Sequence, residues 1–267
     1  MIPPLQPRES VLLAGVLGLV ALALLGPAVA QHAGYHAFAD QQLRWGVPHA
    51  VDVLSNLPFA LVALAGAWRL QSVGAQLPAG ERTMAWLSCA GLLLTALGSS
   101  WYHLQPHDAG LLVDRTAMSA AFAGLLGLAA CRVSQRSGMT VGLLVLVAAP
   151  AAAQSFAATG NLLPWVVVQG GGLVLLAVLA TSRPDPSALP IRWWLVIAGY
   201  AVAKLLELQD HAIWRLTGEV ASGHSLKHVV AALSVLPVIA AWRRPTRPQN
   251  PGQRPLQAAR QQGGANP

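Results

Sequence analysis

The sequence predicts an all-α membrane protein, a bundle of seven membrane-spanning helices with one additional N-terminal hydrophobic helix. Three observations support this fold class. Of the 267 residues, 54% are hydrophobic and only 10% are charged, and the mean hydropathy of +0.51 is well above that of soluble domains. The apolar stretches have about the 20 residues that a helix needs to cross a bilayer. They are rich in Leu and Ala and lack the alternation of β-barrel strands.

Eight stretches approach the length and composition of a spanning helix. They are residues 10–30, 50–70, 82–104, 110–131, 139–157, 163–181, 190–208 and 223–242. The loops between them are short, so no separate domains are expected. We predict an N-terminal hydrophobic segment and outer loop over residues 1–49, a seven-helix domain over residues 50–242 and a disordered basic tail over residues 243–267.

The first stretch has two interpretations. Residues 28–30, Ala-Val-Ala, fit the A-x-A pattern that precedes a signal-peptide cleavage site. However, Glu9 offsets the single charge of Arg8, and the apolar run is long for a signal peptide. A retained helix is therefore favoured over a signal peptide, and the other seven stretches keep the same orientation in either case.

The arginine distribution predicts how the chain is oriented. With the N-terminus inside, twelve Lys and Arg residues fall in inside segments, and only Arg44 and Arg215 fall in outside loops. Cytoplasmic loops retain positive charge. We therefore expect a multi-pass protein of a bacterial inner (plasma) membrane with a cytoplasmic C-terminus. The basic tail lacks the interleaved aromatic residues of nucleic-acid-binding segments, so no such partner is predicted.

Ionisable and polar residues gather at the outer ends of three of these stretches. Burying such groups in a bilayer costs about 2.5–3.5 kcal/mol on insertion scales. Ser99 and His103 are four residues apart and share a helix face, as do His224 and His228. Asp114 lies about one turn below the outer start of its stretch. The topology predicts that all five residues lie at one depth, in the outer leaflet.

A metal site is the interpretation that this arrangement favours. Cys89 and Cys131 both fall in or beside apolar stretches, so a metal must use His and carboxylate. Three neutral imidazoles suit zinc, and catalytic zinc sites keep a fourth position open for water. Hydrogen bonding between helices and a proton pathway of Asp and His are the alternatives.

These five residues carry a resemblance to a known family. The Ser99-x-x-x-His103 pair, Asp114 and the late His224-x-x-x-His228 pair resemble the alkaline ceramidase family. That family belongs to a superfamily of seven-helix membrane hydrolases with the adiponectin-receptor-like and Per1-like families. The resemblance implies that the three histidines hold zinc and that Ser99 and Asp114 are catalytic, beside the metal-bound water. It also implies a membrane lipid substrate, a ceramide or related N-acyl lipid, from which a fatty acid is released.

One segment departs from the family pattern. Eukaryotic alkaline ceramidases carry an acidic calcium-binding cluster before and at the start of their first core helix. Here Asp40 could match the first acid, and Asp52 follows, but His49 stands near the place of a later Glu. Because calcium takes six to eight oxygen ligands, two acids are few, and a family-type calcium site is not predicted.

Three further residues are candidates for substrate binding. Lys204 and Glu207 are three residues apart and can pair on one helix face. The alternative is that they grip a lipid headgroup together with His211, which lies at the same outer end. Lys227 is expected to project away from the metal ligands and to snorkel outward.

The sequence thus predicts a zinc-dependent intramembrane amide hydrolase. An ester-cleaving lipid hydrolase of the same superfamily is one alternative, and a non-enzymatic zinc-containing receptor or transporter is another, because one scaffold can host several functions. The sequence specifies neither the acyl length nor the oligomeric state.

Overall fold

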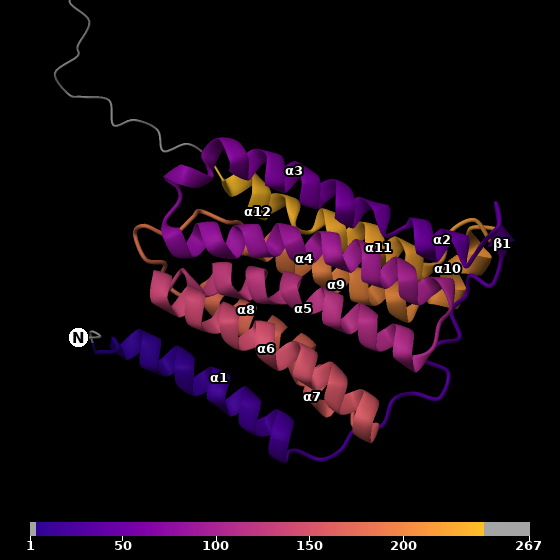
Figure 1. The fold of residues 1–267 in the computed structure, drawn as a ribbon, viewed down its shortest axis with the longest axis horizontal. Helices are drawn as coiled ribbons and strands as arrows, with labels where there is room; N and C mark the ends of the chain where they lie inside the picture. The colour runs from indigo at the N-terminus through magenta and orange to yellow at the C-terminus, as the bar shows by residue number, and fades with distance from the viewer. Residues whose placement is uncertain (1–3, 243–267) are drawn as a thin grey trace, which may run out of the picture.

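The structure is a computed structural model that describes residues 4–242. The basic tail predicted for residues 243–267 lies outside these residues. The long helices run side by side along the longest axis of the molecule (Figure 1). Helix α10 and strand β1 lie at one end of this bundle, and the N-terminus lies toward the other (Figure 1).

Helices make up most of the described chain. Their bounds are α1 Pro7–Leu25, α2 Ala50–Leu54, α3 Leu57–Val73, the 3-10 helix η1 Gly74–Gln76, α4 Ala79–Leu104, α5 Asp108–Ala130, α6 Gln135–Thr159, α7 Leu163–Val166, the π-helix η2 Val167–Gly171, α8 Gly172–Thr181, α9 Trp193–Leu208, α10 Asp210–Leu216, α11 Gly223–Leu233 and α12 Leu236–Ala241. Within residues 4–242 the only strands are β1 Leu43–Arg44 and β2 Val47–Pro48, which form an antiparallel pair. The helical fold class is confirmed.

Seven helical units of the described chain are long and apolar enough to cross a membrane. They are Pro7–Leu25, Ala50–Gln76, Ala79–Leu104, Asp108–Ala130, Gln135–Thr159, Leu163–Thr181 and Gly223–Ala241. The sequence predicted an eighth over residues 190–208, but α9 has only 16 residues. It begins after the proline-rich stretch 184–190 and ends at Leu208, yet it packs alongside α8 and α11 as a member of the bundle.

Two of the predicted spans are interrupted near proline. Pro58 stands in the first turn of α3 and Pro237 in the first turn of α12, where a missing N–H costs least. Only Ser55 and Asn56 separate α2 from α3, and only Ser234 and Val235 separate α11 from α12. Both interrupted spans contribute polar side chains, such as Asp52 and His224, to the same end of the bundle, here called the polar end.

Helices α4 and α5 pack closely through small residues. A Cβ atom at Gly91 would lie 2.0 Å from the Ala121 backbone nitrogen, and one at Gly98 would lie 2.5 Å from the Ala117 Cβ. Only glycine permits backbones this close, as is usual where membrane helices associate. The seam fixes the C-terminal half of α4 against the N-terminal half of α5.

Helix α1 lies at the edge of the bundle beside α6 and α7 (Figure 1). At its N-terminal end the Glu9 carboxylate accepts a hydrogen bond from Ser134 Oγ at 2.5 Å. Past its C-terminal end, Val29 N donates to Asn161 Oδ1 at 3.0 Å, and the Val29 carbonyl accepts from Leu162 N at 2.7 Å. The N-terminal stretch is therefore a helix held to the bundle at both ends.

Candidate metal centre

Three histidines from two helices meet in the interior of the bundle. His103 stands at the end of α4, and His224 and His228 occupy the first two turns of α11. One potential ligand atom from each lies within 4.8 Å of those of the others, and Nε2 of His103 is 3.2 Å from Nε2 of His224. The three side chains are buried, with exposed fractions of 1%, 6% and 4%. This cluster could hold a metal ion.

The start of α11 is fixed by several hydrogen bonds. Ser222 caps the helix through a bond from Ser225 N to its hydroxyl at 2.8 Å. Asp210 accepts the backbone N–H of His224 at 2.8 Å. A Cβ at Gly223 would lie 2.2 Å from the Leu206 carbonyl oxygen, so this end of α11 rests directly on α9. The imidazoles therefore project from a rigid helix start.

Two neighbouring groups orient the histidine rings. Ser55, at the break between α2 and α3, lies with its hydroxyl 2.8 Å from Nδ1 of His228. A bond of this kind fixes the direction of a ligand ring. The Phe38 ring packs against His103 and His224, with centroid distances of 4.8 and 4.4 Å. The Phe38 ring thus covers one side of the cluster.

Ser99 and Asp114 lie beside this cluster in the fold. Ser99 is one turn before His103 on α4 and is buried. The preceding residue, Gly98, lies close to Asp114 on α5, because a Cβ at Gly98 would lie 3.6 Å from the Asp114 Cα. Asp114 Oδ1 is buried and has no hydrogen-bond partner among residues 4–242. An acceptor is therefore available at the polar end of the bundle.

Lys227 differs from its expected position. Its ammonium group does not snorkel outward: it lies 2.9 Å from Nε2 of His224 and 2.9 Å from a carboxylate oxygen of Glu207. Lys227 follows His224 by three residues, and residues three apart share a helix face. The Lys204–Glu207 pair expected on α9 is confirmed, so Glu207 binds two ammonium groups at once.

The remaining substrate-binding candidate lies apart from the histidine cluster. His211, on α10, is exposed, and its Nε2 lies 3.0 Å from the Ala37 carbonyl oxygen. It therefore contacts the segment between α1 and β1. Glu207 and Lys204, by contrast, are connected to the cluster through Lys227.

Asp40 and Asp52 hold together the segment before and within α2. Both carboxylate oxygens of Asp40 accept N–H groups, from Gln42 at 3.1 Å and from Val51 at 2.9 Å. Asp52 accepts a hydrogen bond from the Ser222 hydroxyl at 2.7 Å and so ties α2 to the start of α11. These contacts organise the loop that carries Phe38.

An apolar cavity of about 130 Å³ lies within the bundle, next to the histidines. Its lining includes Phe59, whose ring centroid is 6.2 Å from that of His228. Phe122, Leu173 and Val196 are among the other lining residues, which come from several helices. The cavity can take a hydrocarbon segment, since an apolar cavity of about 150 Å³ holds benzene.

Sequence reasoning missed Phe38 and the contact between Lys227 and Glu207. Phe38 sits in an irregular loop, where no periodicity indicates which side chain turns inward. The position of Lys227 beside His224 could have been predicted, because residues three apart share a helix face.

Comparison of this chain with protein-family models, with curated proteins and with solved structures found no match.

Proposed function

We propose that this protein is a zinc-dependent intramembrane hydrolase that cleaves the amide bond of a ceramide or a related N-acyl lipid. The observation that carries the proposal is the meeting of three buried imidazoles with a buried serine and an unpartnered carboxylate oxygen. A carboxyl group beside a metal site can serve as a general base. The five residues are those through which the chain resembles the alkaline ceramidase family.

The donor set fits zinc. Two nitrogen ligands about 2.0–2.1 Å from a tetrahedral zinc lie about 3.3 Å from each other. Nε2 of His103 and Nε2 of His224 are 3.2 Å apart. Three neutral imidazoles leave a fourth position for water or substrate. When bound, zinc lowers the pKa of a water molecule toward about 7 and polarises a carbonyl oxygen.

The protein's own residues supply proton transfer and orientation. Asp114 accepts the proton from the attacking water as the new carbon–oxygen bond forms. It then delivers that proton to the amine nitrogen as the carbon–nitrogen bond breaks. Ser99 donates a hydrogen bond to the oxygen on which negative charge develops. The products are a fatty acid and an amine.

The apolar cavity supports a lipid substrate. It lies next to His228 and is lined mainly by hydrocarbon side chains, so it can take the part of an acyl chain nearest the carbonyl. With the arginine-rich end of the bundle on the cytoplasmic side, the histidines belong to the outer leaflet of a bacterial inner membrane, and the C-terminus is cytoplasmic. The substrate then reaches the site from the bilayer.

A panel of lipid substrates tests this proposal. The purified full-length protein, loaded with zinc, is incubated with N-acyl and O-acyl lipids of matched chain length, and fatty-acid release is measured. Release from the N-acyl lipids is expected, and Asp114→Asn is expected to lower it by about 10²–10⁴-fold, the usual contribution of a general acid–base. Release that is equal in Asp114→Asn and the parent protein would contradict the role of this carboxyl group.

Metal analysis of the same preparations separates the site from the reaction. The parent protein should contain about one equivalent of zinc, and His224→Ala should lose most of it, because one ligand is removed. Asp114→Asn should keep its zinc. Cleavage of O-acyl lipids alone would favour the ester-cleaving alternative, and bound zinc without any release would favour a receptor or transporter.

A further inference from the structure

A long apolar crevice runs between α1 and the bundle and begins at the end opposite the histidines. One part, of about 520 Å³, lies between α1 and α8, and its lining includes Val11, Gly15 and Val178. A second part of about 240 Å³ continues between α1, α6 and η2. The two parts share Leu19 and Leu175 in their linings, so they adjoin, and together they are here called the α1 crevice.

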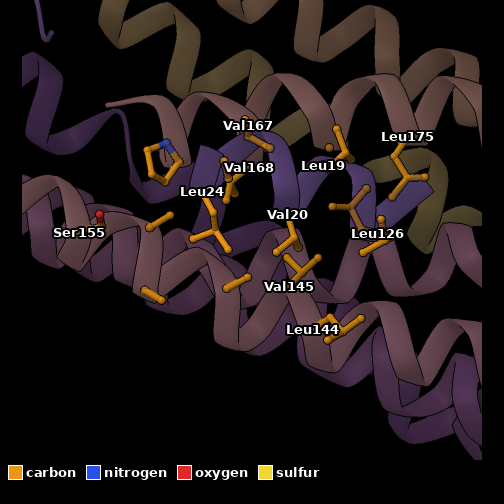
Figure 2. A pocket seen from close by; sticks show the side chains of 17 residues that line it. Leu19, Val20, Leu24, Leu126, Leu144, Val145, Ser155, Val167, Val168 and Leu175 are labelled. Carbon is orange, nitrogen blue, oxygen red and sulfur yellow. The ribbon is translucent and has the colours of Figure 1, made fainter. Parts of the chain in front are cut away.

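The walls of the α1 crevice are almost wholly hydrocarbon. Figure 2 shows Leu19, Val20 and Leu24 of α1 together with Val145 of α6 around the second part. The only hydroxyl-bearing residue in that lining is Ser155. Apolar cavities of even about 150 Å³ stay dry and bind hydrocarbon. The crevice therefore suits an alkyl chain and not water.

Basic groups stand at one end of the α1 crevice. Arg8 belongs to the lining of the larger part, and its guanidinium donates to the carbonyl oxygen of Arg183. Arg132 lies in the adjoining turn after α5 and donates to Ser182 O at 2.6 Å. Burial and the nearby Arg8 lower the pKa of Arg132, which means that positive charges crowd here.

The nearest acidic groups are engaged with other partners. Glu9 accepts hydrogen bonds from Ser134 Oγ at 2.5 Å and from Gln6 N at 2.9 Å. Asp185 accepts two hydrogen bonds from Ser187, through its hydroxyl and its backbone N–H. Both carboxylates keep their negative charge, but four arginines at this end outnumber them, namely Arg8, Arg132, Arg136 and Arg183. A net positive charge therefore lies beside the mouth of an apolar crevice. Basic pockets between membrane helices are typical sites for anionic lipid headgroups.

We propose that the α1 crevice binds one anionic phospholipid, with its phosphate at Arg8 and Arg132 and an acyl chain between α1 and α8. The anchoring of α1 at both ends supports a bound chain, because the helix is held to the bundle while a gap remains along its length. This site lies at the arginine-rich end and is independent of the reaction proposed for the histidines.

Two glycines of α1 provide a matched test. A Cβ at Gly15 or at Gly18 would have no neighbouring atom within 4 Å, so a larger side chain fits at both positions. Gly15 lines the α1 crevice, whereas Gly18 lines neither part of it. A leucine at Gly15 fills the space meant for the acyl chain, and a leucine at Gly18 does not.

The experiment measures lipid retention by the full-length protein. The parent, Gly15→Leu and Gly18→Leu are reconstituted in vesicles of equal parts phosphatidylglycerol and phosphatidylcholine, extracted, and examined by native mass spectrometry. The parent and Gly18→Leu are expected to keep one phosphatidylglycerol, and Gly15→Leu is expected to lose it. Arg8→Gln should lose the preference for phosphatidylglycerol over phosphatidylcholine. Circular dichroism verifies that each variant has the parent's helix content.

Two results would overturn the proposal. Retention of phosphatidylcholine as readily as phosphatidylglycerol by the parent would mean an unselective contact with bilayer lipid. Equal retention by Gly15→Leu and Gly18→Leu would mean that the lipid binds elsewhere. Should Gly15→Leu fail to fold, Arg8→Gln decides the question through its headgroup preference.

Discussion

Glu207 accepts hydrogen bonds from two lysines, and one of them, Lys227, also contacts a candidate metal ligand, His224. An ammonium group at this position repels a divalent cation, and the Glu207 carboxylate offsets that repulsion. In a partly buried site such charges interact more strongly than in water. Metal affinity should therefore depend on the balance between these two charges.

Substitutions of opposite sign test this balance. Lys227→Met removes the positive charge and should tighten zinc binding by about tenfold, or about 1.4 kcal/mol. Glu207→Gln removes the negative charge, leaves two lysines unbalanced and should weaken binding by a similar factor. Competition with a chromophoric chelator measures both. Lys204→Met serves as the control, because its side chain is 43% exposed and solvent screens it more. A change in the same direction for Lys227→Met and Glu207→Gln would refute the electrostatic explanation.

The candidate ligands could be predicted at the residue scale because their spacing carries geometric information. His224 and His228 are four residues apart, and so are Ser99 and His103, so each pair shares a face on any regular helix. The contribution of Phe38 could not be predicted, because it depends on a loop path fixed by Asp40 and its backbone partners. Local spacing predicts neighbours on one helix and says little about irregular segments.

At the scale of elements, the seam between α4 and α5 determines where Ser99 and Asp114 meet. A Cβ at Gly91 would lie 2.0 Å from the Ala121 nitrogen. Any side chain there must push the two helices apart. The shift would be transmitted along α4 toward its C-terminal end, where Ser99 and His103 lie.

The substitution Gly91→Ala should destabilise the protein although Ala favours helices. Overpacking typically costs about 1–3 kcal/mol, which exceeds the gain of about 1 kcal/mol in helix propensity. Gly18→Ala is the matched control, because a Cβ at Gly18 has no neighbour within 4 Å, and it should be neutral or stabilising. Thermal unfolding in detergent provides the comparison. If both variants unfold at the parent's temperature, the seam is looser than described.

The existence of the long helices follows from hydropathy, and their interruptions do not. The span predicted over residues 190–208 became the 16-residue α9 because prolines delay its start. The π-helix η2, Val167–Gly171, differs from an α-helix only in which backbone groups form hydrogen bonds. Amino-acid composition does not reveal this difference. The strands β1 and β2 are two residues each, too short for an alternating pattern. Hydropathy thus predicts burial in a membrane but not local backbone geometry.

For the whole molecule, a metal ion held between α4 and α11 would act as a cross-link. A ligand that binds only the folded state at 100 times its dissociation constant stabilises by about 2.7 kcal/mol. Treatment with a chelator should therefore lower the unfolding temperature by several degrees, and zinc should restore it. His228→Ala should show no response to either treatment. A parent protein insensitive to chelation would mean that the three histidines hold no structural metal.

The overall arrangement was predictable in part. The arginine distribution and the alternating direction of the spans predict from sequence alone that His103 and His224 lie at one depth. In the structure the two side chains are neighbours. The position of α1 was not predictable, since a uniformly apolar stretch does not specify which neighbour it contacts. The α1 crevice is likewise a consequence of packing between helices distant in the sequence.

The separation of the histidines along the chain has a consequence for biosynthesis. His103 and His224 are 121 residues apart, and the second of them opens the last spanning unit. At synthesis rates of about 5–20 residues per second, roughly 6–24 s pass between the appearance of the two imidazoles. During that interval the growing chain holds an incomplete ligand set, so a partly inserted chain has no metal centre. The order of the chain itself delays the proposed metal centre until the unit Gly223–Ala241 has been made.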